Sequence, residues 1–209
     1  MTAAATKRVK SAKSSTTRNR IFLILLIVLF AIPPLAAWLL IDKWRPDGVV
    51  AHGELLTPAR PLPAWQGRSS NNGQPNDANV LRGRWNMVYL SSGETCNQVC
   101  ETSLYNMRQM KIALGKDMER AQTVLLLLQA PDSELSSWLE QEHPAMLKFV
   151  LDDTTLPDFM AEAFGSAAVD QGIYLVDPLS NVFMRYDPDV NPHDILKDLQ
   201  RLFKYSKLG

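Results

Sequence analysis

The chain has 209 residues and a mass of 23.4 kDa, which predicts one domain, with or without appended segments. Its 22 basic and 22 acidic residues balance, so the composition argues against a broad nucleic-acid-binding surface. Hydrophobic residues make up 46% of the chain and charged residues 21%, so most of it can bury a core. Two cysteines exclude a disulfide-rich scaffold and a four-cysteine zinc site, and three histidines leave little material for a histidine-rich metal site.

Residues 1–20 form a strongly basic segment. They contain no acidic residue and six basic ones: Lys7, Arg8, Lys10, Lys13, Arg18 and Arg20. The rest of the chain therefore holds 16 basic and 22 acidic residues, a net charge of −6. Because the segment is also rich in Ala, Ser and Thr, we expect a disordered basic tail.

Residues 21–41 form a continuous uncharged stretch. A helix that rises about 1.5 Å per residue would span about 31 Å here, which is enough to cross a bilayer. Pro33 and Pro34 predict a kink that membrane helices tolerate, and Trp38 and Trp44 are typical of an anchor at the membrane surface. The alternative is a cleaved signal peptide, but its apolar region is shorter and ends in small residues. The pattern therefore favours a retained transmembrane helix.

The charges on either side of this helix predict its orientation. Six basic residues precede it, whereas Asp42, Lys43, Arg45 and Asp47 cancel after it. The positive-inside rule then places the tail in the cytoplasm and the rest of the chain outside. We expect a single-pass protein of a bacterial inner membrane with its C-terminal domain in the periplasm; in a mitochondrion the domain would face the intermembrane space. Disulfides persist in either compartment.

The remaining chain divides into a tether and a compact domain. Residues 42–80 contain five prolines and four glycines and are predicted to be a spacer, with a short strand near 49–56. Residues 81–209 have the size of one small domain.

The pattern of apolar and turn residues predicts the elements of this domain in chain order. Its strands are expected at 85–91, 123–129, 149–151, 172–176 and 182–186, the last two joined by a hairpin turn. Its helices are expected at 95–115 with Thr95 as the cap, at 131–142, at 156–164, and after Asn191 with Pro192 at the first helical position.

A βαβ unit followed by a late hairpin predicts a mixed sheet with helices on both faces. The fold class is therefore α/β, with the arrangement of the thioredoxin superfamily: a mixed sheet flanked by helices and preceded by one N-terminal transmembrane helix.

The sharpest chemical signal is the pair Cys96 and Cys100, at the junction of the first strand and its helix. In a helix, this spacing places both residues on one face with Cα atoms about 6 Å apart, which a disulfide accepts. A helix N-terminus stabilises a thiolate, and two thiolates suit Cu(I). The pair is thus a candidate catalytic thiol–disulfide site and a candidate copper site; a structural disulfide or two inert thiols is the alternative.

At these residues the chain resembles the SCO/SenC family of cytochrome c oxidase assembly proteins. The resemblance covers residues 49–205 and is carried by 85–89, by Cys96-Asn-Gln-Val-Cys100, and by Val169-Asp170-Gln171 before 173–178. It implies a thioredoxin fold that handles Cu(I) or thiols for the copper centre of cytochrome c oxidase. It also implies oxidase subunits or assembly factors as partners. The membrane as a partner follows instead from residues 21–41, and the expectation of no nucleic acid from the charge balance.

The chain departs from the pattern of that family. The resemblance implies two cysteines and a histidine as copper ligands, but the matching triplet here ends in Gln171, and Val169 is the alternative counterpart. The resemblance also implies a proline directly after the first cysteine, but this chain has Asn97 at that position. A divergent relative is therefore indicated.

The three histidines and the methionines after the cysteine pair have simpler interpretations. We expect His193 to be a solvated helix residue and His143 to end a helix; His52, in the tether, is the one histidine considered for a role near the cysteines. Met107 and Met110 are at helical spacing, which is typical of core residues.

Two hypotheses of different class follow. The first is a membrane-anchored thioredoxin-like protein that assists cytochrome c oxidase biogenesis through thiol–disulfide or two-cysteine Cu(I) chemistry; as an enzyme it would be a thiol–disulfide oxidoreductase. The second is a non-catalytic assembly or scaffold protein of the respiratory membrane.

Overall fold

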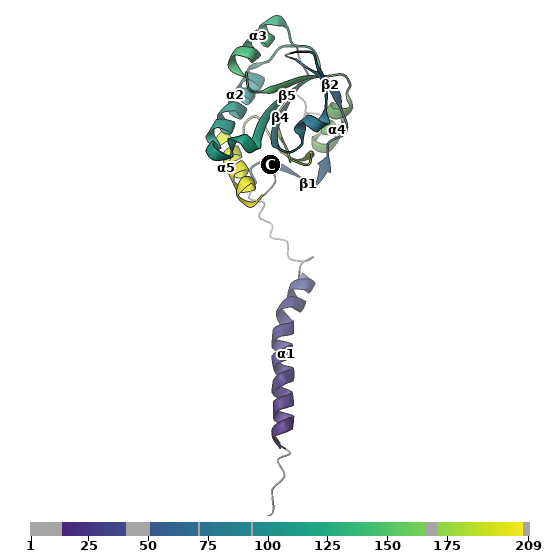
Figure 1. Cartoon of the computed structure of the whole chain (residues 1–209), viewed down its shortest axis with the longest axis vertical. Coiled ribbons are helices and arrows are strands. Elements are labelled where there is room, and N and C mark those ends of the chain that lie inside the picture. The colour runs from purple at the N-terminus through teal and green to yellow at the C-terminus, as the bar shows by residue number, and fades with distance from the viewer. Residues whose placement is uncertain (1–13, 41–50, 71, 93, 166–170, 207–209) are drawn as a thin grey trace, which may run out of the picture. The chain divides into compact units, whose positions relative to one another are not determined.

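The computed structural model describes residues 14–40, 51–70, 72–92, 94–165 and 171–206 of the chain (Figure 1). The chain forms two compact units, Met1–Val49 and Val50–Gly209, which are described separately below.

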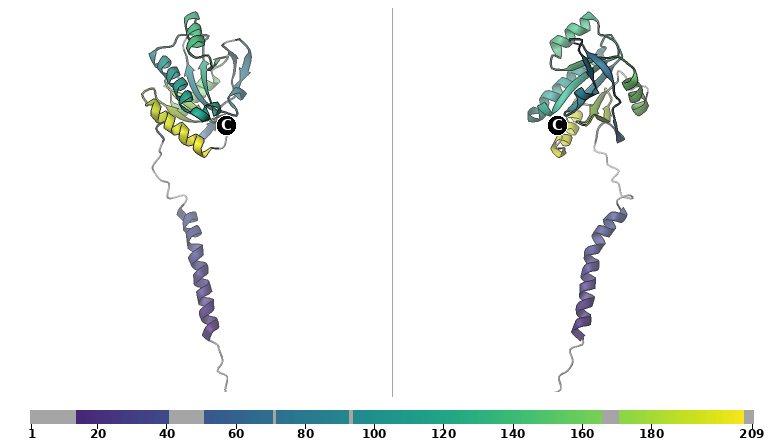
Figure 2. Two further views of the ribbon diagram at one scale, coloured as in Figure 1. Left: turned by 60° about the vertical axis from the view of Figure 1, so that its left-hand side comes forward. Right: turned by 45° about the vertical axis from the view of Figure 1, so that its right-hand side comes forward.

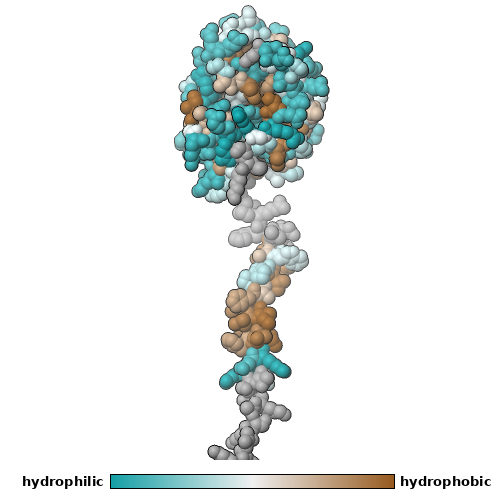
Figure 3. Space-filling view, viewed as in Figure 1, coloured by the Kyte–Doolittle hydropathy of each residue, from teal (hydrophilic) through white to brown (hydrophobic). Residues whose placement is uncertain are grey.

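The first unit contains one long helix, α1, at Ser14–Leu40. Among the described residues it is the one helix that is long and apolar enough to cross a membrane, over Thr17–Leu40 (Figure 3). Pro33 and Pro34 lie inside it, and the helix bends in its C-terminal part (Figure 2). The expected apolar helix is therefore present. Trp44, the second expected anchor residue, lies outside the described residues.

The second unit is built on one eight-stranded mixed sheet with the strand order β1-β8-β7-β4-β5-β6-β2-β3. Strands β4, β5 and β6 are parallel to one another, and the remaining neighbours are antiparallel. The strands are β1 Glu54–Pro61, β2 Gln66–Ser69, β3 Pro75–Asp77, β4 Trp85–Ser91, β5 Ala121–Leu127, β6 Leu147–Leu151, β7 Ile173–Val176 and β8 Asn181–Tyr186.

Helices cover both faces of this sheet (Figures 1 and 2). Helices α2, α3 and α5 pack on one face, and α4 packs on the other with the short helix η1. The α-helices are α2 Gln98–Ala113, α3 Ser133–Glu142, α4 Thr155–Phe164 and α5 Pro192–Tyr205, and the 3-10 helices are η1 Ala78–Leu81 and η2 Gly115–Arg120. The predicted thioredoxin-like mixed sheet flanked by helices is confirmed.

The central strand β4 explains why both faces need a cover. All seven of its residues are buried. Met87 and Tyr89 contribute to the core under α2 and α5, whereas Val88 and Leu90 contribute to the core under α4. Because side chains alternate between the two faces of a strand, a continuous apolar run fits only a sheet that is covered on both sides.

Much of the predicted spacer belongs to the folded domain. Residues 54–81 form β1, β2, β3 and η1, and the three strands extend the sheet at both edges. The spacer predicted over 42–80 is therefore wrong over this part. The physical reason is the burial of Trp65, which is 1% exposed and packs against Phe149 with ring centroids 5.7 Å apart. A spacer would leave that indole in water.

The start of α2 also differs from the expectation. The N-cap is Asn97, not Thr95, and its side chain accepts a hydrogen bond from the backbone N–H of Cys100 at 2.9 Å. Asn and Thr both cap helices, and the residue whose oxygen reaches the N3 amide decides the boundary. The expected cap Asn191 and Pro192 at the first turn of α5 are confirmed. The helix expected from residue 131 begins at Ser133, with Asp132 as its cap.

Candidate functional site

Cys96 and Cys100 are joined by a disulfide, and their Cα atoms are 5.3 Å apart. The expectation that they can form one intramolecular disulfide is therefore confirmed. The expectation that both lie in one helix is wrong, because Cys96 precedes the Asn97 cap and only Cys100 is helical. The loop, rather than the i,i+4 spacing of a helix, brings the two sulfurs together.

The two cysteines differ in their exposure to solvent. Cys100 is 4% exposed and belongs to the core that includes Leu104 and Met107. Cys96 is only half-buried and packs against the edge of that core. A reaction partner can therefore reach Cys96 first, while Cys100 stays covered behind it.

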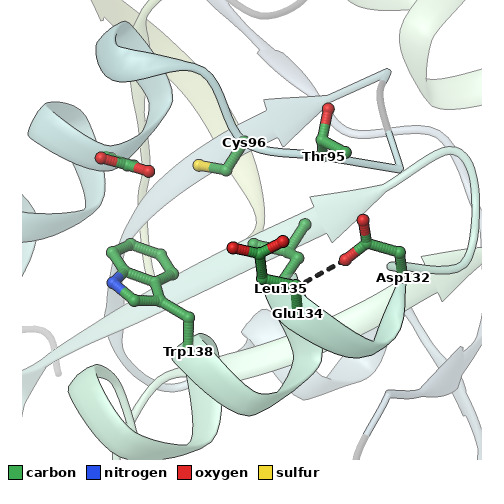
Figure 4. Close-up of a pocket in the computed structure, with 7 residues that line it drawn as sticks. Thr95, Cys96, Asp132, Glu134, Leu135 and Trp138 are labelled. Atoms are coloured by element: carbon green, nitrogen blue, oxygen red, sulfur yellow. Dashed lines mark hydrogen bonds between the residues drawn. The ribbon is translucent and has the colours of Figure 1, made fainter.

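A pocket of about 240 Å³ opens beside Cys96 (Figure 4). Cys96 borders it from the loop before α2, and Leu135 and Trp138 border it from α3. Its charged residues among those described are all acidic: Glu101, Asp132 and Glu134.

Asp132 stabilises the wall of this pocket. It is the N-cap of α3, and its carboxylate accepts a hydrogen bond from the backbone N–H of Leu135 at 2.7 Å (Figure 4). The cap fixes the entry of α3 opposite the cysteine loop, and the backbone N–H of Asp132 donates to the carbonyl of Glu94 at 3.1 Å. The cysteine loop and α3 are therefore tied together at this point.

The segment that ends in Gln171 reaches the same end of the sheet. In the antiparallel pairing of β7 with β4, Ile173 lies opposite Tyr89, so Gln171 lies beyond the C-terminal end of β4, where the cysteine loop begins. Its side chain is exposed, and its backbone carbonyl accepts from Arg185 Nη2 at 2.8 Å. Val169, the alternative counterpart of the family histidine, lies outside the described residues.

His52 is bound elsewhere in the domain. Its backbone N–H donates to Asp198 Oδ2 at 2.8 Å, and its Nδ1 lies 3.2 Å from Asp198 Oδ1. The hydroxyl of Tyr186 donates to the same carboxylate at 3.2 Å, and burial together with Asp198 raises the pKa of Tyr186. His52 therefore holds the start of the domain against α5 and does not line the Cys96 pocket.

The other two histidines occupy the places expected for them. His193 is exposed in the first turn of α5. His143 is the residue that ends α3, but it is 2% exposed, and neither of its ring nitrogens has a hydrogen-bond partner. Desolvation, followed by the positive charge of Arg108, lowers its pKa to about 4, so the ring is neutral. Met107 and Met110 are buried core residues, as predicted.

The described residues do not assemble the three-ligand copper site that the resemblance implies. Within them, no group of three or more His, Cys, Asp and Glu side chains could hold a metal ion. The two sulfurs are bonded to each other, and a glutamine occupies the position of the implied histidine. Reduction of the disulfide would expose two soft sulfur donors, which suit Cu(I) better than Cu(II).

Sequence reasoning missed three residues of this site: Asn97 as the cap, Asp132 as a pocket wall, and Trp138. Asp132 lies at the start of the helix expected over 131–142, but its place opposite the cysteines depends on how α3 packs. Of the three, only Asn97 could have been found from the local sequence, because Asn is a preferred N-cap residue.

Comparisons with known proteins agree with this geometry. The family model described as transmembrane-like, thioredoxin-like, C-terminal domain matches residues 85–206. A search of the curated proteins finds no significant match.

Three solved structures show how far the likeness of fold extends. Apo Sco1 from Thermus thermophilus is 17% identical, with a TM-score of 0.58 over 73% of this chain and 96% of that chain. Yeast Sco1 with copper bound is 12% identical, with a TM-score of 0.57 over 70% of this chain and 94% of that chain. BsSco is 14% identical, with a TM-score of 0.52 over 71% of this chain and 96% of that chain; it is a member of the Sco family of cytochrome c oxidase assembly proteins, and a disulfide switch is identified in it. At these identities the likeness establishes the fold.

Proposed function

The chain belongs to the transmembrane-like, thioredoxin-like C-terminal domain family, and from this premise we propose that it is a membrane-anchored thiol–disulfide exchange protein. Cys96 is the sulfur that meets the partner, and Cys100 is the resolving sulfur. The observation that carries the proposal is the unequal exposure of two bonded cysteines beside an open pocket.

The exchange runs in two steps. In the reduced protein, the Cys96 thiolate attacks a partner disulfide; a bond forms between Cys96 and one partner sulfur, and the other partner sulfur leaves as a thiolate that takes a proton. Cys100, deprotonated, then attacks the Cys96 sulfur, which forms the Cys96–Cys100 disulfide and releases the second partner thiol. From the disulfide seen here, the same steps run in reverse and oxidise a partner dithiol.

The proposed setting is cytochrome c oxidase biogenesis at a membrane. It rests on the resemblance to the Sco family and on the solved relative BsSco, which belongs to the Sco family of cytochrome c oxidase assembly proteins. The proposed layout is a basic cytoplasmic tail at 1–20, a membrane span at 21–41 and an external domain from about residue 50, with oxidase subunits or assembly factors as partners. A reporter that is active only outside the inner membrane, fused after Gly209, should be active; activity from a cytoplasm-specific reporter alone would contradict this topology.

Cu(I) is a second cargo to consider, because yeast Sco1 is solved with copper bound. In this chain the reduced pair offers two soft sulfurs, while Gln171 replaces the histidine that the resemblance implies. Weak two-sulfur contact with Cu(I) is therefore compatible with the residues, but thiol exchange makes fuller use of them. The non-catalytic scaffold remains the alternative that the same replacement favours.

Trapping of the mixed disulfide separates exchange from a scaffold role. Full-length protein in detergent, carrying Cys100→Ser, should accumulate a covalent adduct with a disulfide-containing peptide, since no resolving sulfur remains. Cys96→Ser should give at least tenfold less adduct, because its remaining sulfur is buried. Equal adduct formation by the two variants, or none by either, would support the scaffold.

A further inference from the structure

The pocket beside Cys96 is the first of three adjoining hollows between α2 and α3. Their volumes are about 240, 330 and 640 Å³. The first and second share Glu101 and Trp138 as walls, and the second and third share Arg108, Glu142 and His143. Together they form one groove that starts at a reactive sulfur, which we call the α2–α3 groove.

A buried histidine lies at the middle of this groove. His143 borders both the second and the third hollow and is 2% exposed, and its ring centroid lies 4.9 Å from that of Trp138. Both of its ring nitrogens are buried, so the ring is part of the wall and offers a docked segment no hydrogen bond.

The two ends of the groove differ in chemistry. The end at Cys96 is bordered by three acidic side chains, and no basic residue lies among the described residues there. The far end is bordered by Ile112 and Met118, which are 58% and 37% exposed, and also by the oppositely charged Lys111 and Glu119. A ligand that fits both ends needs a positive charge near the sulfur and an apolar group at the other end.

The length of the groove sets the size of this ligand. Glu101 and Ile112 are 11 residues apart on α2, which at about 1.5 Å per residue is about 16 Å. An extended chain rises about 3.3 Å per residue, so about five residues cover that length. A short extended segment of a protein fits, whereas a small thiol such as a single amino acid would fill only the first hollow.

We infer that the α2–α3 groove docks an extended segment of the exchange partner, with a basic residue next to its reactive cysteine and an apolar residue four or five positions away. The inference rests on the thiol exchange proposed above and adds the chemistry of the partner. Where the second and third hollows meet, Arg108 donates to both the carboxylate and the backbone carbonyl of Glu142, which ties α2 to α3.

The test uses full-length Cys100→Ser protein in detergent, with Cys96 first converted to a mixed disulfide with the coloured thiol 5-thio-2-nitrobenzoate. A reduced single-cysteine peptide attacks Cys96; a peptide–Cys96 bond forms, the bond to the coloured thiol breaks, and that thiol leaves as a coloured thiolate. Two peptides are compared, Cys-Arg-Ser-Gly-Ser-Leu and its counterpart Cys-Glu-Ser-Gly-Ser-Ser. We expect the first to react about tenfold faster at subsaturating concentration.

Matched variants locate the effect in the groove. Ile112→Ser should remove most of the rate advantage of the first peptide over the second, and Glu101→Gln should lower that advantage about two- to threefold. Leu179→Ser is the control, since Leu179 is 57% exposed in the turn after β7, at the opposite end of the sheet. Equal rates for the two peptides, or an equal loss in Leu179→Ser, would overturn the inference.

A small thiol separates this failure from failure of the exchange itself. 2-Mercaptoethanol needs no groove, so it should release the coloured thiol at the same rate from the Ile112→Ser variant as from its parent. If 2-mercaptoethanol reacts while the peptides do not differ, the exchange stands and the groove assignment is wrong. If nothing displaces the coloured thiol, both proposals fail.

Discussion

The two ends of the central strand β4 are built for different tasks. At its C-terminal end lie the half-buried Cys96 and an open pocket with three acidic residues in its wall. Beyond its N-terminal end lies the turn between β7 and β8, where the carboxylate of Asp177 accepts three hydrogen bonds, from the backbone N–H groups of Leu179 and Asn181 and from the Asn181 side chain. In the turn the Asp177 carboxylate is saturated with hydrogen bonds, whereas Cys96 at the other end borders an open pocket that a partner can enter. The reactive cysteine and the hydrogen-bonded turn thus lie at opposite ends of one strand.

The largest expected effect concerns His143 in the α2–α3 groove. Its folded-state pKa of about 4 lies below the ordinary value of 6.5, so the unfolded chain binds the proton more readily. This contribution to stability is present above about pH 6.5 and is lost as the pH falls toward 4. Arg108 and Lys148 oppose protonation, while Glu142 favours it. His143→Phe should remove up to about 3 kcal/mol of this pH dependence, measured by urea unfolding at pH 7 and pH 4.5.

Aspartate and glutamate side chains also take up protons between pH 7 and pH 4.5. The variant and its parent are therefore compared by how steeply the free energy of unfolding changes with pH. The exposed His193→Phe variant is the matched control and should retain the slope of the parent. An unchanged slope in His143→Phe would mean that the ring is solvated or paired in solution.

At the saturated end, Asp177→Ala should lower the free energy of unfolding by about 2 kcal/mol, because three hydrogen bonds of the turn lose their acceptor. Thiol exchange at Cys96 should stay within a factor of two, because the turn is at the other end of β4. Chemical denaturation and a coloured-thiol release assay measure the two effects. A tenfold fall in exchange would contradict the separation of the two ends.

Gln171→His tests how close the reactive end is to a three-ligand metal site. If the side chain faces the cysteines, the new imidazole should raise the affinity of the reduced protein for Cu(I) about tenfold. Competition with a Cu(I) chelator measures it, with His52→Ala as the control, which should leave the affinity unchanged because His52 is held by Asp198. No gain in Gln171→His would show that this segment turns away, and tight Cu(II) binding lost in His52→Ala would show that the third ligand is His52.

The smallest effect is expected at the helix cap that holds the cysteine loop. Asn97→Ala should cost about 1 kcal/mol of stability, since the N–H of Cys100 loses its acceptor. Asn97→Asp keeps the acceptor and should restore the stability. If both variants are equally stable, the capping bond contributes nothing in solution.

Particular residues show how much of this molecule could be predicted from the sequence. Strand β4 was predictable because seven consecutive buried residues leave one interpretation, and α5 because Asn191 and Pro192 mark its start. Of the edge strands, only β1 was anticipated, in part, by the strand expected near 49–56. Strands β2 and β3 were not, since prolines and glycines mask them and the burial of Trp65 depends on contacts distant in sequence. The cysteine pair was found from its spacing. The acidic pocket and the burial of His143 could not be found, because they arise where α3 packs beside α2.

Limited alkylation directly measures how much more reactive Cys96 is than Cys100. The full-length protein is reduced, treated briefly with a substoichiometric thiol reagent, and digested for mass spectrometry. We expect Cys96 to be labelled at least tenfold faster than Cys100, because Cys100 is 4% exposed while Cys96 borders an open pocket. Equal labelling, or faster labelling of Cys100, would contradict it.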